Sequence, residues 1–363
     1  MNDIAELKRF VVLHARAQQL PPEQCRAVLD RIDNDEEGQA GSWAVEWSRS
    51  AAELRERGDL LAASRHWTMA RFPFVDGPTR QKALDDAVGA FDGWRAEAGI
   101  DRVRLDTPGG ELRCWATERP AGPARPLLLV MGGIVSTKEQ WAPALPLVHR
   151  LGMTGVVAEL PGVGQNTRQY DRDSWRMIPD LLDALGPVAS GVDIYALALS
   201  FSGHLALRAA GHDERLKGIV LAGAPVHDFF ADPQWQRGIP RVTRDTLAHL
   251  TGTEPAEVAG RIAGWGLTDD ELRAVRIPVS CVVSTRDEVI PRSDVDRLIR
   301  TLPHLRLLEH DDVHGSPDHV AESQMWSVRS VLRMSGARPL QRVGLTAALG
   351  MTRLRRKLAA ART

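Results

Sequence analysis

The sequence predicts an α/β protein with a mostly parallel sheet of about eight strands behind a helical N-terminal region. Six short apolar runs between residues 126 and 312 show no polar alternation, which is typical of strands buried on both faces. Residues 1–100 show helical periodicity and almost no strand pattern. We therefore expect a helical domain (1–100), an α/β domain (101–336) and a basic C-terminal tail or helix (337–363).

The N-terminal region contains two segments with the periodicity of helices that bury one face. Residues 51–74 and residues 77–99 both place apolar side chains three or four positions apart. The apolar positions are Leu54, Leu60, Leu61, Ala63, Trp67, Ala83, Ala87, Phe91 and Trp94. The second segment ends at Gly99, a residue type that often terminates helices.

From residue 101 the sequence changes to short apolar runs bounded by glycine and proline. Residues 101–116 predict a hairpin whose turn contains Pro108, Gly109 and Gly110. The runs that follow predict the buried strands: PLLLVMGG, TGVVAELPG, VDIYALALS, KGIVLAGAP, PVSCVVSTRDE and HLRLLEHDD. The connection over residues 227–276 is too long for one crossover helix, so a helical insertion is expected there.

Composition argues against several kinds of partner. The formal net charge of -1 provides no field for gathering nucleic acid or acidic lipid. Residues 1–20 contain early carboxylates and no long apolar core, so they predict neither a signal peptide nor a membrane span. Cys25, Cys114 and Cys281 are far apart, which argues against a disulfide framework. We expect a soluble cytoplasmic protein with no nucleic-acid or membrane partner, and a homodimer is left open.

Residues 196–207, ALALSFSGHLAL, lie where a strand passes into a helix and contain two serines with small neighbours. Hydrolases mount a nucleophile on such a sharp turn, in which the residues two before and two after it crowd together. Ser200 as nucleophile places Ala198 and Ser202 at the crowded positions, whereas Ser202 as nucleophile would place His204 there. Ser200 is therefore the predicted nucleophile, with other small residues in place of the usual glycines.

Two backbone amides are expected to form an oxyanion hole. The amide of Phe201 lies at the N-terminus of the predicted helix, where developing negative charge is stabilised. Gly132 and Gly133 end a predicted strand and allow the chain to turn close to the site. The amide of Ile134 or its neighbour is the expected second donor.

A serine nucleophile needs a base, and the base needs an orienting carboxylate. The chain order serine, acid, histidine of such hydrolases predicts an acid at the end of a later strand. In the run VSCVVSTRDEVIP a predicted strand ends at Asp287, with Glu288 beside it, and Asp287 is the expected acid.

Three histidines follow the last predicted strand in LRLLEHDDVHGSPDH. His314 lies in a loop and is the expected base, because His310 is still close to the strand and His319 opens the final helix. His310, Asp311, Asp312 and His314 also form a tight H-D-D-x-H cluster. No second ligand group accompanies this cluster at an obvious spacing, so we expect no metal and no cofactor.

The motifs GDLLAASRHWTMARFPF, GGIVSTKEQW, ELPGVGQN, ALSFSG and STRDEVIP together resemble the α/β-hydrolases with a helical N-terminal domain, the FrsA-like esterases. That group includes 2,6-dihydropseudooxynicotine hydrolase and fungal pigment chain-shortening hydrolases. The resemblance implies an α/β-hydrolase fold with Ser200 as nucleophile, Asp287 as acid and His314 as base. It also implies that residues 1–100 cap the active site, so that a small-molecule substrate lies between the two domains.

One position departs from the family pattern. The carbon–carbon hydrolase of the group has a glutamate in the motif that here reads GGIVSTKE, where this chain has Val135, which argues against that activity. Glu159 ends a predicted strand and either holds a loop or lines the substrate pocket. His227, Phe230 and Trp235 open the insertion and either line an apolar pocket or form the core of a lid.

The first functional hypothesis is a serine hydrolase that acts on an ester or related acyl group of a largely apolar small molecule. An amphipathic pocket beneath the helical cap is expected because the sequence offers no charged cluster for a polar substrate. The second is a tailoring enzyme of secondary metabolism that removes an acyl or acetate group from a polyketide, by hydrolysis or by elimination with His314 as the base. A carbon–carbon bond hydrolase and a catalytically inactive binding protein are the remaining alternatives.

Overall fold

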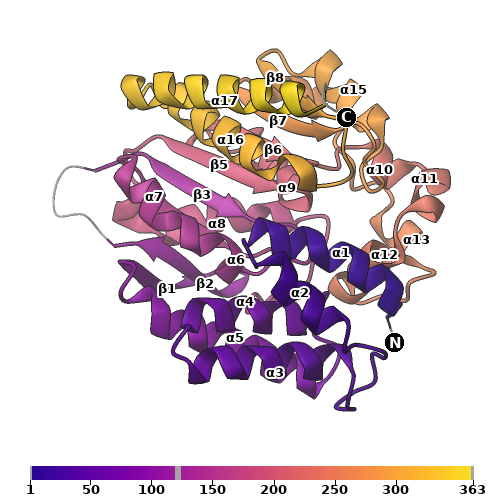
Figure 1. Cartoon of the computed structure of the whole chain (residues 1–363). Helices are drawn as coiled ribbons and strands as arrows, with labels where there is room; N and C mark the ends of the chain where they lie inside the picture. The colour runs from indigo at the N-terminus through magenta and orange to yellow at the C-terminus, as the bar shows by residue number, and fades with distance from the viewer. Residues whose placement is uncertain (1, 119–123, 361–363) are drawn as a thin grey trace.

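A computed structural model of the protein describes residues 2–118 and 124–360, with residues 355–360 described by their backbone alone (Figure 1). Helices form the chain before the first strand: α1 (Ile4–Ala17), α2 (Pro22–Leu29), α3 (Trp43–Glu56), α4 (Leu60–Arg71) and α5 (Pro78–Arg95). They bury a core of their own around Trp43 and Trp47. This apolar core explains why the segment folds as helices, since isolated helices of this length are marginal in water.

Within the described residues, eight strands form one sheet in the order β1-β2-β4-β3-β5-β6-β7-β8. The strands are β1 (Ile100–Thr107), β2 (Gly110–Thr117), β3 (Leu127–Met131), β4 (Thr154–Ala158), β5 (Ile194–Leu199), β6 (Leu216–Ala222), β7 (Val279–Ser284) and β8 (Leu305–His310). The pairs β1–β2 and β2–β4 are antiparallel, and the other pairs are parallel. The predicted mostly parallel sheet is confirmed.

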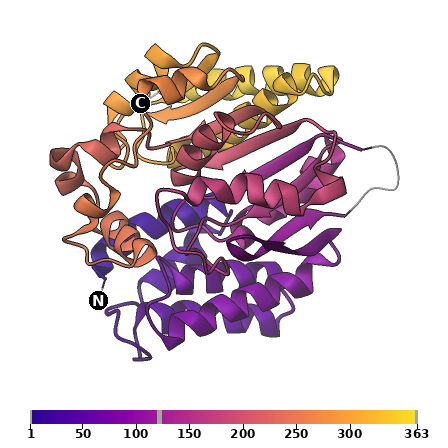
Figure 2. The same ribbon diagram turned by 180° about the vertical axis from the view of Figure 1, so that it is seen from behind.

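The parallel strands are buried on both faces, as their unbroken apolar runs predict. Successive residues of β3 point to opposite sides, so Leu129 belongs to one core and Leu128 to another. The first core lies under α8 (Met177–Ala184), α9 (Phe201–Ala210) and α15 (Arg292–Thr301). The second lies under α5, α7 (Leu145–Arg150), α16 (Val320–Met334) and α17 (Pro339–Ala360), and Figure 2 shows both layers from behind.

The topology collects the predicted site residues at one edge of the sheet. Parallel strands have their carboxyl ends on the same side, where α/β proteins bind ligands. Ser200 follows β5 directly, Asp287 follows β7 by three residues, and His314 follows β8 by four. Gly133 lies two residues beyond the end of β3, which is the neighbour of β5.

A helical insertion connects β6 to β7. Its helices are α10 (Asp228–Ala231), α11 (Pro233–Gly238), α12 (Arg241–Thr251), α13 (Val258–Ile262) and α14 (Asp269–Ala274). The carboxylate of Asp294 on α15 is fully buried and accepts four backbone N–H bonds, from Val226, His227, Asp228 and Phe229. This one side chain therefore anchors the start of the insertion to the α/β domain.

Helix α1 connects the helical domain to two parts of the α/β domain. The carboxylate of Glu6 accepts the backbone amides of Arg241 (2.9 Å) and Val242 (2.7 Å) at the start of α12, and the views place α1 beside α12. Near its other end, Arg16 forms an ion pair of 2.7 Å with Asp318, in the segment that follows His314. Helix α1 therefore extends from the helical insertion to the segment that follows His314.

The basic tail forms α17, which packs on α16 through Leu349; residues 361–363 lie outside the described residues. The remaining short elements are α6 (Lys138–Trp141), η1 (Ala142–Ala144), η2 (Ser174–Arg176), η3 (Gly186–Val188) and η4 (Pro317–His319). Across the ranges that the structure describes, no helix combines the length and the apolar character needed to cross a membrane.

Candidate active site

Ser200 occupies the turn between β5 and α9 in a conformation that L-amino acids rarely adopt. Its φ is 55° and its ψ is -127°. Such a backbone is strained by about 1–3 kcal/mol and is held by the surrounding structure. The Ser200 amide donates to the carbonyl of Ala222 (2.7 Å), and the Ser200 carbonyl accepts from Gly203 (2.8 Å). These bonds fix the elbow on which hydrolases present a nucleophile.

The small residues around the elbow have separate tasks. A β-carbon at Gly203 would lie 2.5 Å from Cβ of Ala224, so α9 can approach the segment after β6 this closely only with glycine there. Ser202 is fully buried, and its hydroxyl lies 3.0 Å from the carbonyl oxygen of Met131 and 2.9 Å from that of Leu199. Ser202 therefore ties β3 to β5. The role of Gly203 could not be predicted from the local sequence, because the contact involves a distant segment.

The side chains of Ser200, His314 and Asp287 form a continuous hydrogen-bonded chain. Oγ of Ser200 lies 3.1 Å from Nε2 of His314. Nδ1 of His314 lies 2.9 Å from Oδ2 and 3.0 Å from Oδ1 of Asp287. A carboxylate only accepts hydrogen bonds, so Nδ1 carries the proton and Nε2 is left free to accept the serine proton. The three residues selected from chain order thus lie in the arrangement of a serine, a base and an orienting acid.

The acid and the base are each held by further contacts. Oδ1 of Asp287 accepts the backbone amides of Val289 (2.9 Å) and Ile290 (2.8 Å). The carboxylate of Glu288 accepts the backbone amide of His314 at 2.9 Å. The loop after β7 therefore positions the imidazole of His314 through two neighbouring carboxylates, those of Asp287 and Glu288.

The charges around His314 favour its protonated form. Burial acts to lower the pKa of the imidazole, but the charge and hydrogen bond of Asp287 and the charge of Glu288 outweigh burial. The net effect raises the pKa of His314 above its ordinary value. A raised pKa makes His314 a stronger base and stabilises the imidazolium that forms when it accepts a proton.

The other two histidines of this region serve different contacts. His310 ends β8, and its Nε2 lies 3.1 Å from Oγ of Ser323. His319 ends η4 and precedes α16, and its Nδ1 lies 2.7 Å from Oδ2 of Asp312. In the described part of the chain, no three His, Cys, Asp or Glu side chains are arranged to hold a metal ion.

The predicted oxyanion donors flank Ser200. Phe201 is the first residue of α9, so its amide lies at the start of the helix next to the nucleophile. A β-carbon at Gly133 would lie 3.0 Å from Cβ of Ser200, so the loop after β3 passes directly beside it. Gly133 accepts the amide of Ser136 at 3.0 Å, which closes a tight turn around Ile134. Ile134 is thus carried on a short turn close to Ser200.

Two of the predicted pocket residues lie in packed surroundings. Glu159 is buried, and its carboxylate accepts the backbone amides of Lys138 and Gln165, both at 3.0 Å, so it holds the loop after β4. Phe230 is buried against the ring of His204, with 4.6 Å between ring centroids. Glu159 thus holds a loop and Phe230 packs against α9, while a role of either residue in a substrate pocket stays a prediction.

The remaining pocket candidates lie at different places around the site. Val135 packs against the core of the helical domain and that of the α/β domain. Nδ1 of His227 lies 3.0 Å from the carbonyl of Leu267, inside the insertion. Trp235 lines a cavity of about 250 Å³ together with Asp287. Val135 thus lies between the two domains, two residues from Gly133, and Trp235 lies beside a cavity that Asp287 also lines.

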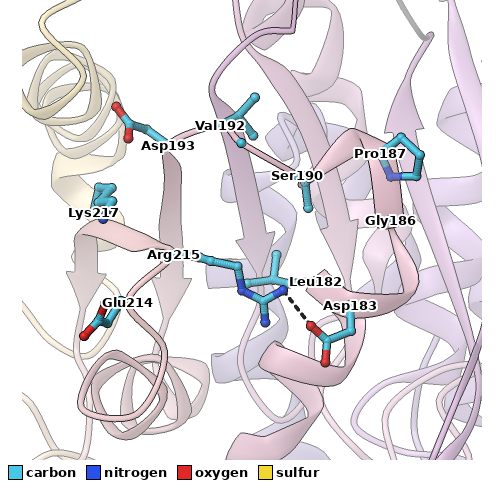
Figure 3. Close-up of a pocket in the computed structure, with 12 residues that line it drawn as sticks. Leu182, Asp183, Gly186, Pro187, Ser190, Val192, Asp193, Glu214, Arg215 and Lys217 are labelled. Carbon is cyan, nitrogen blue, oxygen red and sulfur yellow. Dashed lines mark hydrogen bonds and ion pairs between the residues drawn. The ribbon is translucent and has the colours of Figure 1, made fainter.

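A larger hollow lies away from this site. Figure 3 shows its lining by Asp183, Asp193, Arg215 and Lys217, with an ion pair of 2.6 Å between Arg215 and Asp183. Asp193 precedes β5 and Lys217 lies at the start of β6, so this hollow is at the amino ends of the strands. Ser200 lies at the opposite edge of the sheet, and the hollow takes no part in the arrangement above.

Comparison with known proteins identifies the superfamily to which the chain belongs. No protein-family model matches it. Esterase FrsA of Vibrio vulnificus is 21% identical over 281 residues, 70% of this chain and 67% of the relative. Esterase FrsA of Photobacterium profundum is 22% identical over 321 residues, 78% of this chain and 75% of the relative.

Two solved structures are also similar. AbyA5 in its wild-type form is 49% identical, with a TM-score of 0.92, and the match covers 97% of this chain and 100% of that one. The crystal structure of 2,6-dihydroxy-pseudo-oxynicotine hydrolase is 20% identical, with a TM-score of 0.67 over 89% of this chain and 93% of that one, which supports the fold alone. The chain belongs to the α/β-hydrolase superfamily and is an FrsA-like member of it. These relatives confirm the resemblance to FrsA-like esterases that the motifs indicate. The protein is an enzyme of the α/β-hydrolase class.

Proposed function

We propose that the protein is a serine hydrolase that cleaves an ester or related acyl group of a small molecule. The observation that carries this proposal is the hydrogen-bonded chain from Ser200 through His314 to Asp287, mounted on the strained elbow. The close passage of Gly133 beside Ser200 supports an oxyanion hole made by the amides of Phe201 and Ile134.

The first half of the reaction forms an acyl-enzyme. Nε2 of His314 takes the hydroxyl proton as Oγ of Ser200 attacks the carbonyl carbon, and the carbonyl oxygen becomes an oxyanion facing the two amides. Asp287 keeps the imidazole oriented and stabilises its positive charge. The bond to the leaving oxygen then breaks, and His314 gives its proton to that oxygen.

The second half releases the acid. A water molecule gives a proton to Nε2 of His314 as its oxygen attacks the acyl carbon, and the bond to Ser200 breaks as the serine oxygen takes the proton back. The strained elbow holds the half-buried Ser200 at the carboxyl end of β5, with its hydroxyl next to Nε2 of His314.

Steady-state assays with short p-nitrophenyl esters test this proposal. Ser200→Ala and His314→Ala should each lower kcat by about 1000-fold or more, because the triad acts as a unit. Ser202→Ala is the matched control, since its hydroxyl faces two carbonyls rather than His314. Turnover that survives Ser200→Ala would rule out the covalent route.

Heavy-oxygen water separates hydrolysis from elimination for an acylated substrate such as a secondary-metabolite intermediate. In hydrolysis, one oxygen of the released acid comes from water, so the acid carries the label. In elimination, a base removes a carbon-bound proton and the acid leaves with both of its own oxygens. Released acid without label would assign His314 the role of carbon-proton base instead.

A further inference from the structure

Arg71 is a buried cation at the junction of the helical domain and the α/β domain. It ends α4 and is 2% exposed. Its Nη1 donates to the carbonyl of Pro73 (2.8 Å) and its Nη2 to the carbonyl of Val135 (2.7 Å). A guanidinium has five N–H donors, and Nε of Arg71 has no acceptor within the described residues. Its hydrogen-bonding capacity is therefore only partly used.

Other buried arginines of the protein have acidic partners. Arg80 pairs with Asp35 at 2.5 Å and with Asp76 at 2.8 Å. Arg208 has Glu271 at 3.8 Å. Among the described residues, no carboxylate lies within 4.0 Å of the Arg71 guanidinium. Buried charges are normally paired with an opposite charge, and Arg71 has no carboxylate in this position within the described part of the chain.

The charge of Arg71 persists at neutral pH. Burial is the largest effect on the guanidinium, and it outweighs the more distant charges of Glu159 and Glu139, so the pKa of Arg71 falls to about 10. Those two carboxylates already surround the ammonium of Lys138, at 3.4 Å and 2.8 Å. They therefore balance Lys138 at short range and Arg71 only at long range.

Arg71 lies close to the reacting atoms. Val135, whose carbonyl it contacts, is two residues from Gly133, and two residues span at most about 7 Å. Gly133 in turn lies against Ser200. The guanidinium is thus within the length of a small molecule from the nucleophile.

His14 of α1 completes this side of the site. Its ring lies 5.2 Å from that of Phe72, the residue after Arg71. Burial, followed by the charges of Arg71 and His314, lowers the pKa of His14 to about 4, so His14 is near both residues and neutral at pH 7. Arg71 and the neutral imidazole of His14 therefore both lie near residues that flank Ser200, Arg71 at Val135 and His14 close enough to feel the charge of His314.

We propose that Arg71 binds an anionic oxygen of the substrate, such as that of a carboxylate, while the acyl group lies at Ser200. This inference rests on the proposed hydrolase function and specifies its substrate class as acidic. The sequence pattern alone does not mark this cation, because Arg71 lies 64 residues before Val135 and only the fold brings them together.

The test compares two esters of equal chain length: the mono-p-nitrophenyl ester of a short dicarboxylic acid, which is anionic, and the p-nitrophenyl ester of the matching fatty acid, which is neutral. The wild type should favour the anionic ester in kcat/KM by about 10- to 100-fold, as expected for one charge-assisted pair. Arg71→Met should lower that preference by at least about 10-fold, and Arg71→Lys should retain part of it.

Arg80→Met is the matched control. It removes another buried cation of the helical domain and should disturb that domain without changing the preference between the esters. A wild type with no preference would overturn the inference and leave the hydrolase function intact. Equal losses on both esters in Arg71→Met would also overturn it, and would assign Arg71 only to holding the turn at Val135.

Binding measurements make the test independent of turnover. Calorimetry on Ser200→Ala should show tighter binding of the anionic ester, and Arg71→Met in that background should abolish the difference. If the wild type turned over neither ester but the anionic ester still bound more tightly, the hydrolase function would be rejected and the role of Arg71 would stand.

Discussion

A β-carbon on Gly223 would lie 2.8 Å from Cε1 of His314. Gly223 directly follows β6 and has a φ of 60°, so both its backbone and its surroundings favour glycine. The imidazole of His314 therefore packs directly against the backbone of Gly223. Any side chain at position 223 would push the imidazole away from Ser200 or Asp287.

Gly223→Ala should lower kcat/KM by about 100-fold or more, because a displacement of about 1 Å in a catalytic group has an effect of that size. Gly186→Ala is the control for backbone strain, since Gly186 has a φ of 51° and no heavy atom within 4 Å of the position of a β-carbon. Both variants should lose about 1–2 kcal/mol of stability, and only Gly223→Ala should lose activity. Equal activities would show that His314 tolerates the contact.

Glu288→Gln should move the acidic limb of the kcat/KM profile to lower pH. The charge of Glu288 helps to raise the pKa of His314, and His314 acts as a base only when neutral, above that pKa. Glutamine keeps an oxygen for the backbone amide of His314 but removes the charge, so the pKa falls and the base stays neutral in more acidic solution. A pH–rate profile checks the direction, and a limb that stays in place or moves upward would contradict it.

Asp294→Ala should destabilise the fold by about 3 kcal/mol, because four backbone N–H groups would lose one buried acceptor. Urea unfolding measures the loss. Asp296→Ala, on the same helix, removes an exposed ion pair with Arg292 and should change stability by less than about 1 kcal/mol. Similar midpoints for the two variants would contradict the anchoring role of Asp294.

Glu6→Ala should loosen α1 at the start of α12, where Glu6 accepts two backbone amides. Hydrogen exchange should speed up in α1 and in the first turn of α12, while α3, buried around Trp43, should keep its protection. Glu23→Ala, at an exposed position in the first turn of α2, is the control. Unchanged exchange in α1 would show that its apolar face alone holds it.

Much of the fold can be read from the sequence for a definite physical reason. A parallel strand such as β3 is apolar along its whole length because both faces are covered, and Leu128 and Leu129 do go to different cores. The order of Ser200, Asp287 and His314 along the chain could be interpreted because each follows a strand, and the structure brings the three together. Their catalytic roles stay predictions until they are measured.

The features that could not be predicted depend on contacts between distant segments. Nothing in the local pattern of LAGAP marks Gly223 as the support of His314, since the two are 91 residues apart. Arg71 looks like any helix-ending arginine until the fold places it against Val135. Glu288 looks like a neighbour of the acid, and only its bond to the His314 amide shows that it positions the base.

Covalent labelling with a fluorophosphonate, followed by mass spectrometry of the intact protein and its peptides, asks directly whether Ser200 is the nucleophile. We expect one adduct on Ser200 in the wild type and in Ser202→Ala, slow labelling in His314→Ala and none in Ser200→Ala. A wild type that stays unlabelled, or an adduct on Ser202 instead, would contradict the assignment of Ser200.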